Sequence, residues 1–544
     1  MNQPFHNTGF MLRLLLKRDG LKYLFWLLGL LIYAASGVGK LELAVTTATK
    51  QSMYALFNGP ALVSLFGPTS VSDWQHFTAA AAFGGLMPLT TGLVFSIITM
   101  IYVINRTRKE EDEGITELLR SFQIGKLSNT LSVVLELFCL QVILTFALAL
   151  SIQLQHALGM THFSQNLLFA SAITSQSMMW GMIALLFAQL FPEASPAKGA
   201  SIGFFGLLYI IRMGTDIKDI ALSWFNPLSW SYLTGVYVKN NWLPIFYTLL
   251  FAAVMLVIAL VLEIRRDVAV GYLPQSKARA HAGYFLSTFQ GLVLRLQRIS
   301  ALGWVFGLFV LGLTYGSMIS KIGMLVGGNS NTNHLLQKEL QITQGSNQMV
   351  MKQQFLSTIY VVLALIATCF AITLLNKMVS EERHQRQEQL YALPNSRFSV
   401  YLTYVLSAFG LGTLAQLGGI LGIYVAQAGQ KNAVSFSAMI KGGLPFVIGI
   451  WFVLGILCLL IAFLPRFSNA IWVYVGLSFF LSMIGPILDL PQGMLKLNVF
   501  DWIMKTNGAP NTLNTPSLFV LVFLTLIMIA LGFVAYKKRD IISG

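Results

Sequence analysis

Long apolar runs separated by short charged segments make up most of this chain. Runs of about 20 apolar residues are typical of helices that cross a membrane. We expect such spans at about 22–40, 84–105, 130–156, 167–191, 199–214, 242–263, 301–322, 354–375, 399–427, 438–464, 469–489 and 516–536. The pattern therefore predicts an all-α integral membrane protein with about twelve transmembrane helices.

One charged stretch between apolar runs occurs twice. Shifting Asn105–Lys126 by 271 residues, about half the chain, places its Asn, its Glu-Glu pair, its later Glu and its last basic residue on Asn376, Glu381-Glu382, Glu388 and Arg397. Six spans in each half give both halves the same orientation, so two parallel six-helix repeats are predicted. We expect one half at 1–263, a basic linker with an interfacial helix at 264–300, and the other half at 301–544.

Composition and charge agree with a membrane protein. Hydrophobic residues make up 56% of the chain and charged residues only 10%, against about 25% charged in soluble proteins. The net charge of +15 does not indicate a nucleic-acid partner, because basic residues lie at the ends of apolar runs. With both termini inside, 24 of the 36 Lys and Arg residues fall in inner segments, which favours cytoplasmic termini. Residues 1–20 suit a basic helix in the membrane interface.

No motif for catalysis or metal binding is present in the sequence. It contains no HExxH, no G-x-S-x-G and no Walker A loop, and the three cysteines lie inside apolar runs. We expect no cofactor or metal in this chain, and any nucleotide to be bound by another chain. Glu136, near the start of its span, is expected to pair with a nearby Arg or Lys rather than carry protons. Asp216 and Asp219 are the one candidate pair for a membrane enzyme.

The repeated charged stretch is the best functional signal. On a continuous helix Glu110 and Glu117 would share a face, and Leu118 would add an apolar edge. Such a helix could dock into a soluble partner and transmit force. The candidate coupling residues are Glu110, Glu111, Glu117, Leu118, Glu381, Glu382, Arg386 and Glu388. The alternative is a solvated loop whose charges only set topology.

Two further patterns concern packing. Glycines cluster in the ninth span, at Gly418, Gly419 and Gly422, and we expect them to permit close helix contact. Tryptophans gather between 215 and 242, as in the aromatic belt at a membrane boundary.

These motifs resemble the permeases of the "exporter of polyketide antibiotics" family, the membrane subunits of bacterial ABC exporters associated with tetronasin-type resistance. The likeness lies in the charged stretches Glu110–Leu119 and Glu381–Arg397, in Asn-Pro-Leu-Ser-Trp at Asn226–Trp230, and in Arg265–Asp267 and Asn58–Ala61. The chain departs from it by Gln385 in place of a second Gly114, and by the lack of a clear Asn-Pro-Leu-Ser-Trp counterpart before 516–536.

The resemblance implies a multi-pass protein of the bacterial plasma membrane that exports small amphiphilic or lipophilic compounds. Two copies of a separate cytoplasmic ATPase would hold ATP and Mg²⁺ and contact the charged loops, while lipid surrounds the spans. The rival reading is a secondary transporter of the major facilitator type, which also has twelve spans. Against it, the loop after 84–105 lacks the Gly-x-x-x-Asp-Arg pattern. A membrane enzyme is the third reading.

Overall fold

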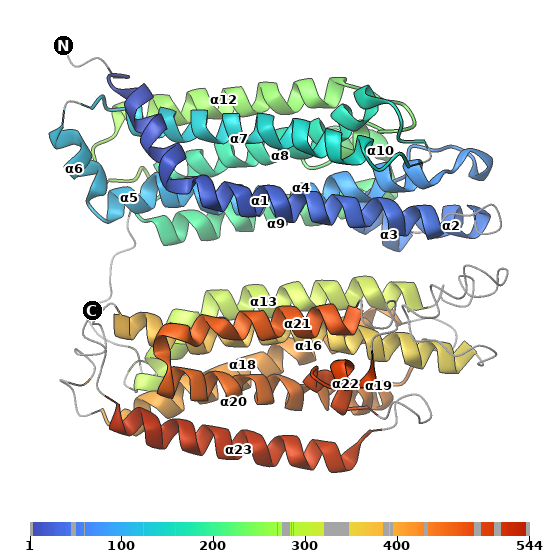
Figure 1. Cartoon of the computed structure of the whole chain (residues 1–544), viewed down its shortest axis with the longest axis vertical. Helices are drawn as coiled ribbons and strands as arrows, with labels where there is room; N and C mark the ends of the chain where they lie inside the picture. Colours follow the sequence, from blue (N-terminus) through green and yellow to red (C-terminus); the bar gives the residue numbers. More distant parts are fainter. Residues whose placement is uncertain are drawn as a thin grey trace. The chain divides into compact units, whose positions relative to one another are not determined.

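The structure is a computed structural model of the chain (Figure 1). It describes residues 4–539 apart from 45–49, 59, 123, 158, 269, 275–282, 284–285, 287, 320–347, 384–390, 392–394, 429–432, 484–490 and 505–512. Two compact units, Met1–Ala278 and Arg279–Gly544, are described separately below. The division between them falls inside the segment that we expect to be a linker.

The first unit is a bundle of long helices around α8. Its long helices are α1 (Thr8–Ala44), α4 (Ala79–Arg106), α7 (Ser128–Gln153), α8 (Phe163–Leu190), α9 (Ala194–Lys218) and α12 (Leu243–Arg265). α8 is the most buried of these helices and packs against α4, α7, α9 and α12, while α1 packs against α7 and α4. Short helices α2 (Lys50–Phe57), α3 (Pro60–Phe66), α10 (Ile220–Ser223) and α11 (Trp230–Leu233) gather at one end of the bundle (Figure 1).

The second unit packs its helices in the same order. Its helices are α13 (Phe289–Ile319), α16 (Gln348–Arg383), α18 (Arg397–Ala426), α19 (Phe436–Gly443), α20 (Phe446–Phe463), α21 (Ile471–Met483) and α23 (Thr515–Lys538). The central helix α20 packs against α16, α18 and α23, and α13 packs against α18 and α16. These contacts correspond, helix by helix, to those of α8 and α1 in the first unit.

Local sequence explains several helix ends. The Thr78 side chain accepts a hydrogen bond from the Ala81 amide at 3.1 Å and so begins α4. In the second unit Ser396 caps α18 in the same way through the Ser399 amide. Side-chain oxygens at these positions satisfy amides that have no partner within the helix. Pro445 lies where the tenth predicted span divides into α19 and α20.

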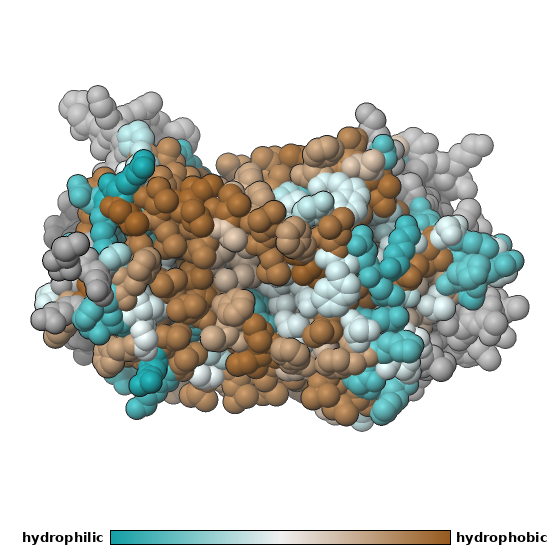
Figure 2. All heavy atoms as spheres, turned by 90° about the horizontal axis from the view of Figure 1, so that it is seen from above, coloured by the Kyte–Doolittle hydropathy of each residue, from teal (hydrophilic) through white to brown (hydrophobic). Residues whose placement is uncertain are grey.

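The prediction of an all-α integral membrane protein is confirmed. The described residues form helices and no named strand, and ten of their helices are long and apolar enough to cross a membrane. Figure 2 shows apolar side chains over the middle of the visible helices and hydrophilic ones towards their ends. α1 and α21 lie outside those ten, so the count of twelve stays a prediction. Figure 1 shows that α1 bends sharply near its start, so the expected interfacial segment is continuous with the first span.

The glycines of α18 bring two helix backbones into contact, as the sequence predicts. A Cβ atom on Gly422 would lie 2.1 Å from the carbonyl oxygen of Phe309, and one on Gly312 would lie 2.1 Å from that of Gly419. Carbon and oxygen cannot approach so closely. Small residues are therefore required where α13 crosses α18.

We expect Gly422→Ala to lower the stability of the second unit by about 1–3 kcal/mol, the usual cost of overpacking a close contact. Gly410→Ala in the same helix is the matched control, because a Cβ there meets nothing within 4 Å. Thermal unfolding in detergent would compare the two variants. Equal midpoints would show that the α13–α18 contact does not depend on glycine.

Candidate functional site

The first charged stretch folds as two short helices, α5 (Arg108–Asp112) and α6 (Ile115–Ser121). Gly114 separates them in a left-handed conformation with φ of 75°, which glycine adopts without a steric penalty. This turn breaks the continuous helix that the sequence predicts. Glu110 and Glu117 therefore do not share a face, since Glu110 is 5% exposed and Glu117 is exposed.

Glu110 is turned inward and ties α5 to α1. It accepts hydrogen bonds from Arg18 at 3.0 Å and from Arg106 at 3.1 Å. Arg106 also pairs with Asp19, which is fully buried. The basic N-terminal part of α1 is therefore bound to the end of α4 through a buried ionic network.

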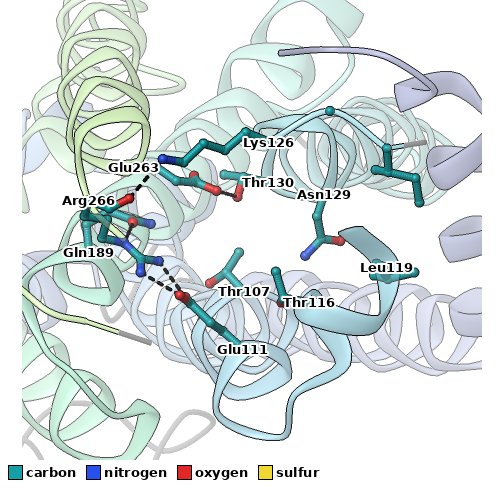
Figure 3. A pocket seen from close by; sticks show the side chains of 12 residues that line it. Thr107, Glu111, Thr116, Leu119, Lys126, Asn129, Thr130, Gln189, Glu263 and Arg266 are labelled. Carbon is teal, nitrogen blue, oxygen red and sulfur yellow. Dashed lines mark hydrogen bonds and ion pairs between the residues drawn. The ribbon is translucent and has the colours of Figure 1, made fainter. Parts of the chain in front are cut away.

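Glu111 is also buried, and it binds the end of α12 (Figure 3). Arg266 donates from Nη1 and Nη2 to the two Glu111 oxygens at 2.6 and 2.5 Å. Lys126 Nζ donates to the carbonyl oxygens of Ile264 at 2.8 Å and Arg266 at 3.0 Å. A bidentate Arg–carboxylate pair is short and directional, and a lysine satisfies the last carbonyls of a helix. We call Glu111, Arg266 and Lys126 the α12 clamp.

The second unit contains the same arrangement at the end of α23. Glu382 is 1% exposed, and Nη2 of Arg539 lies 2.5 Å from both of its oxygens. Arg397 donates to the carbonyls of Lys537 at 3.0 Å and Arg539 at 2.8 Å. We call Glu382, Arg539 and Arg397 the α23 clamp. Its members follow those of the α12 clamp by 271 or 273 residues, so the repeated charges make repeated contacts.

The remaining candidate coupling residues have different surroundings. Glu117 and Leu118 point to the surface, and Leu118 is 63% exposed. Glu381 is half-buried. Arg386 and Glu388 lie outside the described residues. Sequence reasoning missed Arg266 and Arg539 as partners of the Glu-Glu pairs, although the recurrence of Arg-Asp at both positions was the available signal.

α6 presents an apolar face at a charged end of the bundle. Leu118 and Phe122 are 63% and 62% exposed, Ile115 is also exposed, and the neighbouring Glu113 and Glu117 carry acidic groups on the surface. We call these five residues the α6 face. Exposed apolar residues rimmed by charge are typical of a protein interface.

A small polar cavity separates α6 from the helices beneath it (Figure 3). Its volume is about 20 Å³, room for one water molecule. Thr116 Oγ1 and Asn129 Oδ1 line it and have no hydrogen-bond partner among the described residues. α6 therefore lies against a small cavity lined mostly by polar residues.

At the other end of each unit, an Asn and a Trp make matching contacts. Asn226 accepts from the Leu228 amide at 3.0 Å, and the Trp230 indole donates to the Trp224 carbonyl at 2.9 Å. In the second unit Asn498 accepts from the Phe500 amide at 3.3 Å, and the Trp502 indole donates to the Lys496 carbonyl at 2.7 Å. Asn498 and Trp502 are therefore structural counterparts of Asn226 and Trp230, although the three residues between them differ.

Two other predicted carboxylate roles differ from the structure. Asp216 and Asp219 do not converge: Asp216 is buried against Arg212 at 2.5 Å, and Asp219 caps α10 through the Ala221 amide. Glu136 is fully buried and accepts from the Tyr102 hydroxyl at 2.6 Å. Among the described residues no Arg or Lys lies within ion-pair distance of Glu136, so its pairing with a basic residue stays a prediction.

These features define a multi-pass α-helical membrane protein with a clamped charged segment in each half. Residues 286–537 match the family described as "Multidrug efflux system permease Rv1217c, C-terminal domain". The chain is also 27% identical to the multidrug efflux system permease protein Rv1217c of Mycobacterium tuberculosis over 565 aligned positions, which cover 99% of this chain and 97% of that protein. It is therefore similar to a multidrug efflux permease along its whole length.

Proposed function

We propose that this chain is the permease subunit of an ATP-driven ABC exporter that moves amphiphilic or lipophilic compounds out of the cell. Among such exporters it belongs with the tetronasin-type family. It lies in the bacterial plasma membrane, with both termini in the cytoplasm. Similarity to a multidrug efflux permease supports export. The α6 face is the observation that supports a partner ATPase, because it is an exposed apolar patch on a short helix between two spans.

In this proposal the residues of the charged segment divide into two groups. Leu118, Phe122 and Glu117 contact a cytoplasmic ATPase, because they lie on the surface. Glu110 and Glu111 pass the movement on, because they are buried and bound to α1 and α12. Two copies of the ATPase, one for each half, hold ATP and Mg²⁺, and this chain supplies no cofactor.

The mechanism follows from these contacts. Closure of the ATPase dimer displaces α6, and α5 moves with it. The α12 clamp carries that displacement to the last span of the first half, and the Glu110 network carries it to α1. The α23 clamp does the same for the last span of the second half.

A co-purification experiment tests the partner surface. We expect the double variant Leu118→Asp/Phe122→Ser to lose at least about tenfold of the ATPase affinity, because burying one Leu contributes about 1.5–3 kcal/mol. The chain would be expressed with its neighbouring genes and purified in detergent. The matched control is Leu154→Asp, a change at a leucine that is 67% exposed at the opposite end of α7.

Stoichiometric ATPase with the wild type and control, but not with the double variant, would support the proposal. A chain that purifies alone and transports on a proton gradient would contradict it and favour a secondary transporter.

A further inference from the structure

A groove runs between α1 and the α4–α6 segment of the first unit. Its volume is about 530 Å³, within the range of sites for drug-sized molecules. Trp26, Ile98 and Ile101 form its apolar part. Arg18, Lys109 and Glu110 lie at its charged part, so the groove is amphiphilic along its length.

Three aromatic rings make the wall between α1 and α4. The ring centres of Tyr23, Trp26 and Tyr102 lie 5.5–6.2 Å apart in edge-on pairs. Trp26 and Tyr102 line the groove. Arg106 already lies over the Tyr102 ring at 5.7 Å, which leaves the Trp26 ring for a ligand.

A buried carboxylate lies behind this wall. Glu136 accepts from the Tyr102 hydroxyl at 2.6 Å, and that hydroxyl is 2.7 Å from the hydroxyl of Tyr23. Glu136 is fully buried in α7, and its Oε1 has no hydrogen-bond partner among the described residues. A carboxylate within a membrane span is costly and usually serves a function.

Trp26 and Glu136 together favour a positively charged ligand. A cation is attracted to the face of a tryptophan, and Trp26 lines the groove. Glu136 supplies a buried carboxylate behind the same wall. Ile98 and Ile101 suit the apolar body of such a ligand.

We propose that this groove binds amphiphilic cations. The apolar body of the ligand lies against Ile98 and Ile101, and its charged centre lies against Trp26, within the field of Glu136. The inference rests on the proposed export function and names its substrate class. Glu110 lines the groove and belongs to α5, so an occupied groove alters the position of the coupling segment.

The test uses two probes of the same shape and opposite charge, tetraphenylphosphonium and tetraphenylborate. Binding is measured to the full chain in nanodiscs of zwitterionic lipid without ATPase, with empty nanodiscs as the blank. We expect the wild type to bind the phosphonium at least tenfold more tightly than the borate, after subtraction of the blank. Glu136→Gln should remove most of that preference, and Glu193→Gln, a change at an exposed Glu at the start of α9, should leave it intact.

Trp26→Leu keeps all charges and should weaken phosphonium binding about fivefold or more, which covers the case in which Glu136→Gln does not fold. Equal binding of the two probes by the wild type would overturn the proposal, as would an unchanged preference in both Glu136→Gln and Trp26→Leu. The partner ATPase is absent from this assay. Failure here would therefore leave the co-purification result untouched, and failure there would leave this one untouched.

Discussion

Glu111→Arg is expected to abolish transport while the ATPase still binds. The new guanidinium would face Arg108 and Arg266, the two cations that now contact the carboxylate at 3.1 and 2.5–2.6 Å. Breaking a buried ion pair costs about 3–5 kcal/mol, because a charge stays buried without its partner. The α12 clamp would open, whereas the α6 face would be unchanged.

The readout separates coupling from folding. Transport into inverted vesicles should fall at least about tenfold, which corresponds to about 1.4 kcal/mol. ATP hydrolysis by the co-purified complex should continue, because the ATPase still binds. Adding Arg266→Glu should restore part of the transport, because the swap re-creates the pair in reverse. Glu193→Arg is the control: this Glu is exposed at the start of α9, and its side chain does not cap that helix.

Wild-type transport by Glu111→Arg would show that the clamp plays no part in coupling. Loss of transport that the charge swap does not recover would assign Glu111 another role. The corresponding Glu382→Arg variant should behave alike, since Arg539 also binds both oxygens of Glu382, through Nη2.

Arg212→Met is expected to cause the largest loss of stability in the first unit. The Arg212 side chain is fully buried, lies over the Tyr209 ring at 4.7 Å and pairs with Asp216 at 2.5 Å. Its Nη2 also donates to the carbonyl oxygens of Ser64 and Leu65. One guanidinium therefore joins α9 to α3, and Asp216 continues the network to Ser223 and Tyr232.

Without the guanidinium, the Asp216 carboxylate would stay buried, at a cost of about 3–5 kcal/mol. The thermal midpoint should fall by about 10 °C, taking about 2–4 °C per kcal/mol for a unit of this size. Arg212→Met/Asp216→Leu should recover part of the loss, because neither charge remains. Arg265→Met, at an exposed arginine, should change little.

If the thermal midpoint of Arg212→Met stayed within about 2 °C of the wild-type value, the loss of stability would be only about half a kcal/mol. So small a loss would show that water reaches the cluster. Transport retained by a folded Asp216→Asn variant would show that transport does not depend on this network. The pair Asp216 and Asp219 was attractive from sequence because the two carboxylates are close along the chain. Their side chains instead make separate contacts: Asp216 binds Arg212, and Asp219 caps α10.

The sequence alone determined the features that depend on local composition. Apolar runs of sufficient length require helices in a membrane, so most spans were placed to within a few residues. The exceptions are informative: α13 begins 12 residues before its expected span, because its first turns carry the charges that suggested a linker. The glycine contact of α18 was also predictable, since clustered glycines allow a second helix backbone to approach closely.

Only the tertiary structure decided which charges face inward. Glu110, Glu111 and Glu117 are equally acidic in sequence, but the turn at Gly114 buries the first two and exposes the third. Arg266 follows Glu111 by 155 residues, and no local pattern connects them. Asn498 and Trp502 likewise escaped comparison, because their hydrogen bonds need only the spacing of two side chains and not the residues between them. Pairings of this kind depend on where distant helices end. Packing determines those positions, and composition does not.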